Sequence, residues 1–571
     1  MELAAGFPPT TRDDWRRLAV EVLRKSGVEA GSPEEALSSP TYDGVPVMPL
    51  YDAGDLPGDP GLPGAPPFTR GARARPGWDV RQRHAVADPE AVLADLENGV
   101  TSLWLVVGDG AIPVGALPAV LKDVYLDLAP IVLEAGEHTR EAAEALFGLA
   151  AAQGVTPSGN LGASGVEGVE LAGRCVAVPG LRAVMVDATP YHDAGAADAE
   201  ELGCSIARGV AELRTLTGAG LTVEQALGQI DFRYAATADQ FATIAKLRAA
   251  RRLWARVAEV CGAAEHGGQR QHAVTSAAMM TARDPWVNML RTTLACFAAG
   301  VGGAEAVTVQ PFDAALGLPD AFSRRIARNT QSLLLEESGV GRVADPAGGS
   351  WYVERRTADL AERAWAWFQE IEAAGGVAAA GELIERRVAA TRARRDDDIA
   401  HRRFPITGVS EFPDPGEKPL RRPPAPAGRP VARYAQEFEA LRDVADALPE
   451  RPKVFLATIG PVAAHTARAS FAANLFHAGG LATETAGPGA DPEQIATAFA
   501  VSGAAVACLC STDKLYAQHA RAVAAALRHA GARRVWLAGK GDYEGVDACL
   551  YAGCDALAVL RQTFEDLEVL R

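Results

Sequence analysis

Short apolar runs alternate with longer amphipathic stretches from about residue 85 to residue 400. The apolar runs are typical of strands buried in a parallel sheet: 101–109, 129–136, 182–189, 229–237 and 304–313. Between them, apolar residues at i, i+3 and i+4 predict helices: 196–217, 238–261, 285–300 and 320–338. This alternation predicts an α/β fold with a parallel sheet, and its length suits a (β/α)8 TIM barrel.

A second alternation of the same kind follows a proline-rich linker at 408–430. Prolines hold such a segment extended, so it separates two compact units. Beyond it we expect strands at 454–460, 504–510, 533–539 and 556–560, with helices at 464–478, 512–530 and 543–552. This order predicts a small doubly wound domain whose ligand crevice lies at the carboxyl ends of its strands.

The sequence therefore predicts four parts. They are an N-terminal arm (1–65), a barrel (66–407), a linker with a connecting segment (408–452) and a doubly wound domain (453–571). The arm is too rich in Pro and Gly to build its own core, so it must lie on its own barrel or on a partner. Its start carries an apolar set at helical spacing: Phe7, Trp15, Leu18, Val22 and Leu23.

The composition excludes several classes of protein. The net charge of −16 argues against nucleic acid as a partner. The eight cysteines form no CxxC pair, so neither a disulfide framework nor a zinc site is expected. A membrane span and a secretory signal are not expected either, since no long uncharged apolar run occurs and the N-terminus lacks a basic region before an apolar one. These features predict a cytoplasmic protein.

One stretch of the C-terminal domain has the form of a cofactor site. The segment "GPVAAHTARASF" (460–471) places a glycine turn and then His465 directly after an apolar strand. Ligands of doubly wound domains bind at such strand ends. His465 is therefore a candidate cofactor ligand, to be tested against the residues around it.

Several strings along the chain resemble the cobalamin-dependent acyl-CoA mutases, and methylmalonyl-CoA mutase in particular. They are "TYDGVPVMPLY" (41–51), "PPFTRG" (66–71), "DAFSRRIARNTQ" (320–331), "DPAGGSWYVE" (345–354) and "EIEAAGG" (370–376), in the family's order. The resemblance covers essentially the whole chain. It implies a barrel followed by a flavodoxin-like domain of the cobalamin-binding type.

In the catalytic chains of this family, an Asp-x-His-x-x-Gly motif follows the first strand of the C-terminal domain. Its His is the lower ligand of cobalt, and its Asp orients that imidazole. Aligned on Gly460, the three motif positions hold Val462, Ala464 and Ala467. Shifted by one residue, they hold Ala463, His465 and Arg468. Neither register keeps the motif, so we expect no cofactor-binding residues here and a His465 that lies on the helix surface.

The barrel segment 272–288 resembles a family stretch that reads His-Ser-Gln-Thr-Ser-Gly-Trp. As in the C-terminal motif, several of the family's functional residues are replaced here. His272, Thr275 and Ser276 remain, but Val274 replaces the Gln that holds the substrate. Ala273, Ala277 and Ala278 replace the Ser, Gly and Trp. The segment 69–82 is several residues shorter than in the family's catalytic chains, where the omitted piece carries the catalytic tyrosine, and no tyrosine occurs between 52 and 124.

The pair Tyr191–His192 does survive, at a strand end where the family's His contacts the thioester carbonyl. Two residues are missing just after it, so we interpret His192 as a vestigial candidate and expect no catalytic residue and no metal site in this chain.

The resemblance thus implies the small, non-catalytic subunit of a heterodimeric methylmalonyl-CoA mutase. Its catalytic large subunit would bind adenosylcobalamin and interconvert succinyl-CoA and (R)-methylmalonyl-CoA. One alternative is an independently active cobalamin mutase homologue with an unorthodox site. Another is an acyl-CoA-binding sensor or scaffold that uses the barrel as a pocket.

Overall fold

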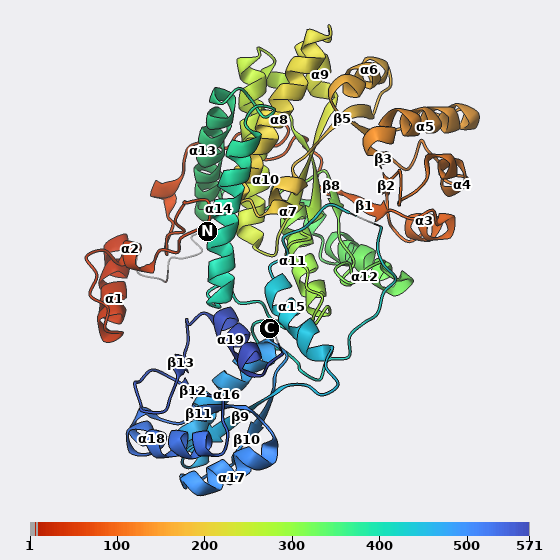
Figure 1. The fold of residues 1–571 in the computed structure, drawn as a ribbon. Helices are drawn as coiled ribbons and strands as arrows, with labels where there is room; N and C mark the ends of the chain where they lie inside the picture. The colour runs from red at the N-terminus through yellow and green to blue at the C-terminus, as the bar shows by residue number, and fades with distance from the viewer. Residues whose placement is uncertain (1–5, 7–9, 427, 570–571) are drawn as a thin grey trace.

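The protein forms a closed parallel barrel followed by a separate five-stranded parallel sheet (Figure 1). The computed structural model describes residues 6, 10–426 and 428–569. The barrel strands are β1 (Asp79–His84), β2 (Ser102–Val106), β3 (Ile131–Glu134), β4 (Gly159–Ala163), β5 (Leu181–Asp187), β6 (Ile230–Ala236), β7 (Arg270–Thr275) and β8 (Ala306–Thr308). They pair in sequence order, and β1 closes on β8. The predicted barrel is confirmed.

Helices surround the barrel and bury their apolar faces against it. They are α3 (Pro89–Leu96), α4 (Leu117–Val120), α5 (Thr139–Gln153), α6 (Gly165–Cys175), α7 (Thr189–Ala194), α8 (Asp198–Gly218), α9 (Val223–Gly228), α10 (Gln240–Val260), α11 (Val287–Val301) and α12 (Ala321–Ser332), which a π-helical segment (Leu333–Glu337) continues. Two long helices, α13 (Trp351–Ala373) and α14 (Gly381–Ala400), complete this layer.

The N-terminal arm has two parts with different surroundings. Helices α1 (Arg12–Lys25) and α2 (Pro33–Leu37) form a small unit that Figure 1 shows projecting from the side of the barrel. From about residue 40 the arm instead lies on its own barrel domain, where the Tyr42 hydroxyl donates to Asp398 (2.9 Å) and Arg394 donates to the Tyr42 carbonyl (2.9 Å). Of the apolar set in the sequence, Leu18 and Val22 are exposed and Leu23 is buried. Phe7 lies outside the described residues.

The C-terminal domain has the strand order β10-β9-β11-β12-β13, as in a doubly wound sheet. Its elements are β9 (Lys453–Thr458), α16 (Val462–Ala478), β10 (Ala482–Thr485), α17 (Pro492–Ser502), β11 (Val506–Cys510), α18 (Asp513–His529), β12 (Arg534–Ala538), β13 (Ala548–Leu550) and α19 (Ala556–Asp566). Alternate residues of β9 enter two apolar clusters, one on each face of the sheet. The predicted fold class is confirmed.

Two elements of this domain were predicted wrongly. The segment 543–552 contains the short strand β13 where a helix is expected, and 556–560 begins helix α19 where a strand is expected. The Asp555 carboxylate caps α19 by accepting from the backbone N–H of Ala558 (2.8 Å). A cap of this kind marks a helix start and outweighs the strand-like run "ALAVL".

Helix α15 (Gln436–Asp446) connects the two domains. Arg283, just beyond β7, pairs with Asp443 (2.5 Å) and Asp446 (2.7 Å) of α15. On the other side, Glu437 of α15 pairs with Arg561 of α19 (2.8 Å). None of the helices among the described residues combines the length and the apolar character that crossing a membrane requires.

Candidate functional site

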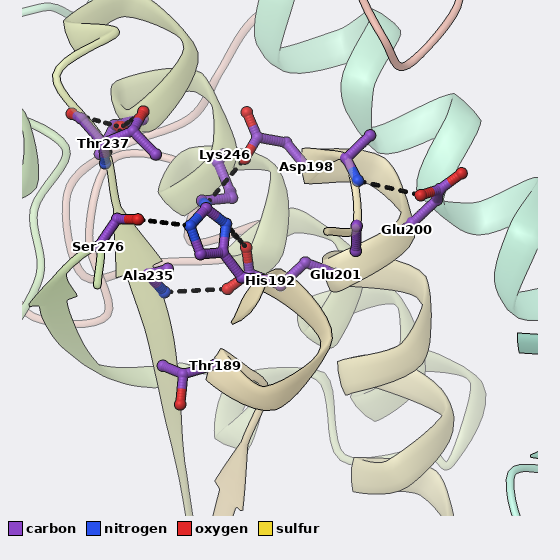
Figure 2. A network of polar contacts seen from close by, with 12 residues as sticks. Thr189, His192, Asp198, Glu200, Glu201, Ala235, Thr237, Lys246 and Ser276 are labelled. Carbon is purple, nitrogen blue, oxygen red and sulfur yellow. Dashed lines mark hydrogen bonds and ion pairs between the residues drawn. The ribbon is translucent and has the colours of Figure 1, made fainter. Parts of the chain in front are cut away.

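A network of buried polar side chains lies at the carboxyl ends of β5, β6 and β7 (Figure 2). His192 of α7 places its Nε2 2.6 Å from the Ser276 hydroxyl. The Lys246 ammonium, fully buried, lies 2.8 Å from a carboxylate oxygen of Asp198 and 2.8 Å from one of Glu201. Each of these side chains thus has its partner inside the protein.

The charges of this network are set by burial and by close pairing. Burial, and then the Lys246 charge, lower the pKa of His192 to about 3, so its imidazole is neutral at neutral pH. Burial raises the pKa of Glu201 to about 7, although Lys246 opposes that rise. The pKa of Lys246 is raised despite burial, because two carboxylates hold its proton. The His192 Nε2 is engaged by the Ser276 hydroxyl.

The bore of the barrel is closed by one layer of side chains. This plug consists of Trp104, Val132, Met185 and Val274, which form one buried cluster. A cavity of about 500 Å³ lies at the amino ends of the strands and one of about 520 Å³ at their carboxyl ends, and Met185 lines both. Both cavities reach the plug at Met185.

A buried arginine reinforces the plug. The Arg233 guanidinium is 2% exposed and lies 3.9 Å from the centre of the Trp104 ring. It pairs with Asp187 (3.1 Å) and Glu134 (3.3 Å), and its Nε donates to the Nδ1 of His272 (3.2 Å). The two carboxylates and the aromatic face stabilise the Arg233 cation in this position. Loss of the carboxylates would leave its charge buried and unpaired.

The linker crosses the carboxyl end of the barrel and binds the same two carboxylates. Arg429 lies 3.1 Å from Asp187 and 3.3 Å from Glu134. The backbone N–H of Ala432 donates to the carbonyl of Asp193 in α7 (2.7 Å). Two arginines and two acids thus alternate across the mouth of the bore.

Nearby, Asp109, Glu137 and His138 bring ligand-type atoms within 4.8 Å of one another, but both acids are exposed to solvent.

The Arg468 side chain lies in the crevice at the carboxyl ends of the C-terminal strands. A Cβ atom at Gly539 would come within 2.8 Å of Arg468, so this guanidinium lies directly on the backbone at the end of β12. Arg468 donates to the carbonyl of Ser511 (2.9 Å), pairs with Asp513 (2.6 Å) and lies 5.1 Å from the centre of the Tyr516 ring. The nucleotide tail of cobalamin would need this space, and the residues present do not fit it.

His465 is buried and not on the helix surface, so that expectation is wrong. It is 9% exposed, and neither ring nitrogen has a hydrogen-bond partner among the described residues. Burial lowers its pKa, which keeps the imidazole neutral. Val462 is exposed, and the alanines at 463, 464 and 467 offer no group that could orient an imidazole. A cobalt ligand would lack its orienting acid here.

The structure separates the two histidines that the sequence singles out. His192 lies in the barrel network, whereas His465 lies in α16 of the other domain.

The charged cluster at the barrel mouth was missed by the sequence analysis. Its signal is visible in retrospect, because Glu134 and Asp187 each end an apolar strand, and acids at the carboxyl ends of barrel strands gather at one mouth.

Comparison with known proteins agrees with this architecture. The family model for methylmalonyl-CoA mutase matches residues 173–465, just over half of the chain. A protein of Streptomyces virginiae named methylmalonyl-CoA mutase small subunit is 55% identical over 607 aligned residues, covering 100% of this chain and 98% of its own. The small subunit of Propionibacterium freudenreichii subsp. shermanii is 40% identical over 624 aligned residues (100% and 97%).

A further relative, from Cereibacter sphaeroides, is named methylmalonyl-CoA mutase without mention of a subunit. It is 32% identical over 473 aligned residues, which cover 72% of this chain but 65% of that protein. The two proteins named as small subunits therefore match this chain along its full length, whereas the Cereibacter sphaeroides protein matches 72% of it. The chain belongs to the methylmalonyl-CoA mutase family.

Proposed function

We propose that this chain is a non-catalytic small subunit of an adenosylcobalamin-dependent methylmalonyl-CoA mutase. It would support a catalytic large subunit that binds the cofactor and interconverts succinyl-CoA and (R)-methylmalonyl-CoA in the cytoplasm. The closed bore carries this proposal. Radical chemistry needs a dry cavity that admits the substrate, and the plug and Arg233 occupy the bore through which a substrate would have to enter.

Two further observations support the absence of chemistry in this chain. His192 is neutral and bonded to Ser276, so its Nε2 is not free to face a substrate carbonyl. The Arg468 side chain lies in the crevice of the C-terminal domain. The cofactor of the holoenzyme would therefore be bound by the partner alone.

The partner itself is implied by the names of the relatives, since a small subunit requires a large one. A heterodimer would need a large, permanent contact, of more than roughly 2,000 Å² in obligate complexes. The projecting α1–α2 unit offers a surface for it, because Leu18 is 54% and Val22 is 63% exposed.

One observation favours the alternative of an unorthodox cobalamin site. The His465 imidazole is neutral, buried and without a partner among the described residues, which are properties that a metal ligand would share. The crevice around Arg468 opposes that alternative.

A titration of the purified chain with adenosylcobalamin separates the two functions. We expect the visible spectrum of the free cofactor to persist at every protein concentration. The matched control is His465→Ala, which should behave identically. A base-off, His-ligated spectrum that disappears in His465→Ala would falsify the proposal and establish the alternative.

A further inference from the structure

A cavity of about 540 Å³ lies outside the barrel bore, between the N-terminal arm, the first turns of α8 and α10, and helix α11. Its volume is within the range of small-molecule sites, about 300–1,000 Å³. One wall is apolar and consists of Met279, Val287, Leu290, Leu294, Phe404, Pro405 and Ile406. The opposite wall is polar and includes Arg356 of α13.

Arg356 is a buried charge that makes no direct ion pair among the described residues, although Asp43 and Asp198 lie near enough to interact with its charge. Its side chain is 5% exposed, and its Nη1 makes a single long hydrogen bond to the carbonyl of Val45 (3.4 Å). Its Nε is buried without any partner, and no carboxylate among the described residues lies within ion-pair distance of it. Burying an unpaired guanidinium is costly, so this geometry indicates an anionic group that completes the site.

The other arginines of the cavity are already engaged. Arg395 donates to the carbonyls of Gly195 (2.8 Å) and Ala196 (3.3 Å). Arg291 donates to the side chain of Asn288 (2.8 Å) and to the carbonyl of Thr407 (2.8 Å). Arg356, with one long hydrogen bond, is therefore the least engaged of the three arginines that line the cavity.

Three acids that line the cavity do not exclude an anion, and one of them, Asp239, caps α10 by accepting from the backbone N–H of Ala242 (3.1 Å). Asp198 is neutralised by Lys246 at 2.8 Å. Asp43 accepts from the backbone N–H of Ala199 (2.6 Å). Loss of water around Asp43, and then the nearby Asp198 charge, raise its pKa to about 7. At or below neutral pH it can therefore carry a proton and donate it to a ligand oxygen.

We propose that this cavity binds a small organic monocarboxylate with an apolar chain. The carboxylate pairs with Arg356, and the chain lies against Leu290 and Leu294 of α11. A planar guanidinium suits a carboxylate because it can donate two parallel hydrogen bonds. This site lies outside the barrel bore, although His192 and Asp198 of the buried polar network also line it, and it does not depend on the subunit role proposed above.

A different explanation of Arg356 makes a different prediction. If its charge only balances Asp43 and Asp198 across water, the cavity needs no anion and no carboxylate binds. Octanoate is a suitable probe, and octanol, which has the same chain without the charge, is its control. Isothermal titration calorimetry at pH 6.5 on the full chain should give saturable binding of octanoate and none of octanol.

Three variants test the assignment. Arg356→Met should weaken octanoate binding at least tenfold, whereas Arg355→Met, on the same helix but paired with Asp359, should leave it unchanged. Leu294→Trp, at a position 44% exposed, should fill the apolar wall and also weaken binding tenfold without disturbing the fold. If Arg356→Met fails to fold, the Leu294→Trp variant still tests whether octanoate binds in this cavity. Absence of octanoate binding, or equal binding in Leu294→Trp, overturns the proposal.

Discussion

At the scale of single residues, His192 illustrates how a catalytic residue type can persist in a structural role. Its ring is 5% exposed, and its Nε2 is held by Ser276 at 2.6 Å. Its Nδ1 lies 3.8 Å from Glu201, whose other oxygen accepts from the backbone N–H of Ala235 (2.9 Å). The imidazole therefore joins α7 to β6 and β7 and contributes to packing.

We expect His192→Ala to leave turnover of the assembled mutase within threefold of wild type. It should still lower the free energy of unfolding of this chain by about 1–3 kcal/mol, because the Ser276 hydroxyl loses its partner in a buried site. Initial rates of the reconstituted enzyme and urea unfolding of the free chain measure the two effects. A tenfold loss of kcat, equal to about 1.4 kcal/mol, would show that His192 still acts on the substrate.

Elements of the arm are attached to the barrel by a few specific contacts. Asp43 binds the backbone N–H of Ala199 at the start of α8 (2.6 Å), next to Asp198 and Glu200 and facing Arg356. Tyr42 binds Asp398 of α14 (2.9 Å). Two acids hold this part of the arm, and their surroundings raise the pKa of Asp43 but lower that of Asp398. The stability of this attachment therefore depends on pH.

The free energy of unfolding of Asp43→Asn, compared with that of wild type, should become more favourable to the variant as pH rises. The pKa of Asp43, about 7 against an ordinary 3.8, means that its favourable contribution is present at low pH and is lost between about pH 4 and pH 7. The amide of an asparagine side chain does not ionise. The difference in unfolding free energy between Asp43→Asn and wild type should therefore increase in favour of the variant from pH 5 to pH 8, as urea unfolding at each pH measures.

The matched control for this experiment is Asp398→Asn. The hydrogen bonds of Arg403 and Tyr42 lower the pKa of Asp398 although burial opposes them, so its contribution is lost only as pH falls through the acidic range. The effect of Asp398→Asn should therefore be equal at pH 5 and pH 8. An effect of Asp43→Asn that is also equal at both pH values would contradict the assigned ionisation.

Deletion of residues 1–30 should weaken assembly with the large subunit and leave the rest of the chain folded. Helix α1 is tied to α2 and to the segment around Asp52 by Arg12 and Arg16, and exposes Leu18 and Val22. Size-exclusion chromatography of the truncated chain with its partner measures the effect. The double variant Leu18→Asp/Val22→Asp is a control without truncation. Co-elution as tight as that of the full-length pair would mean that this unit is not a partner contact.

The elements of the barrel were predictable from sequence because long helices and apolar strands repeat with clear periods. The last third of the C-terminal domain was not, since short apolar runs such as 556–560 fit a buried strand and a helix equally well. For the site, the sequence allowed predictions only where a motif could be compared, as at Val274 and 460–471, and the expected surface position of His465 was wrong. The cluster of Arg233 and Arg429 was not predictable, because the barrel brings together residues far apart in the chain.

At the scale of the whole molecule, side chains of this chain lie in both the barrel bore and the crevice of the C-terminal domain. The bore is closed by the plug and by Arg233, and the linker arginine Arg429 lies across its carboxyl end. Arg468 lies in the crevice of the second domain. An enzyme built from this chain and a catalytic partner should therefore contain a single functional site per pair.

The number of cobalamins in the reconstituted pair tests this account most directly. The purified chain is mixed with the catalytic large subunit, saturated with adenosylcobalamin, freed of excess cofactor and analysed by absorbance against protein concentration. We predict one cobalamin per pair, with the same value when His465→Ala replaces the wild-type chain. Two cobalamins per pair, falling to one in His465→Ala, would show that this subunit carries its own cofactor and would contradict the account.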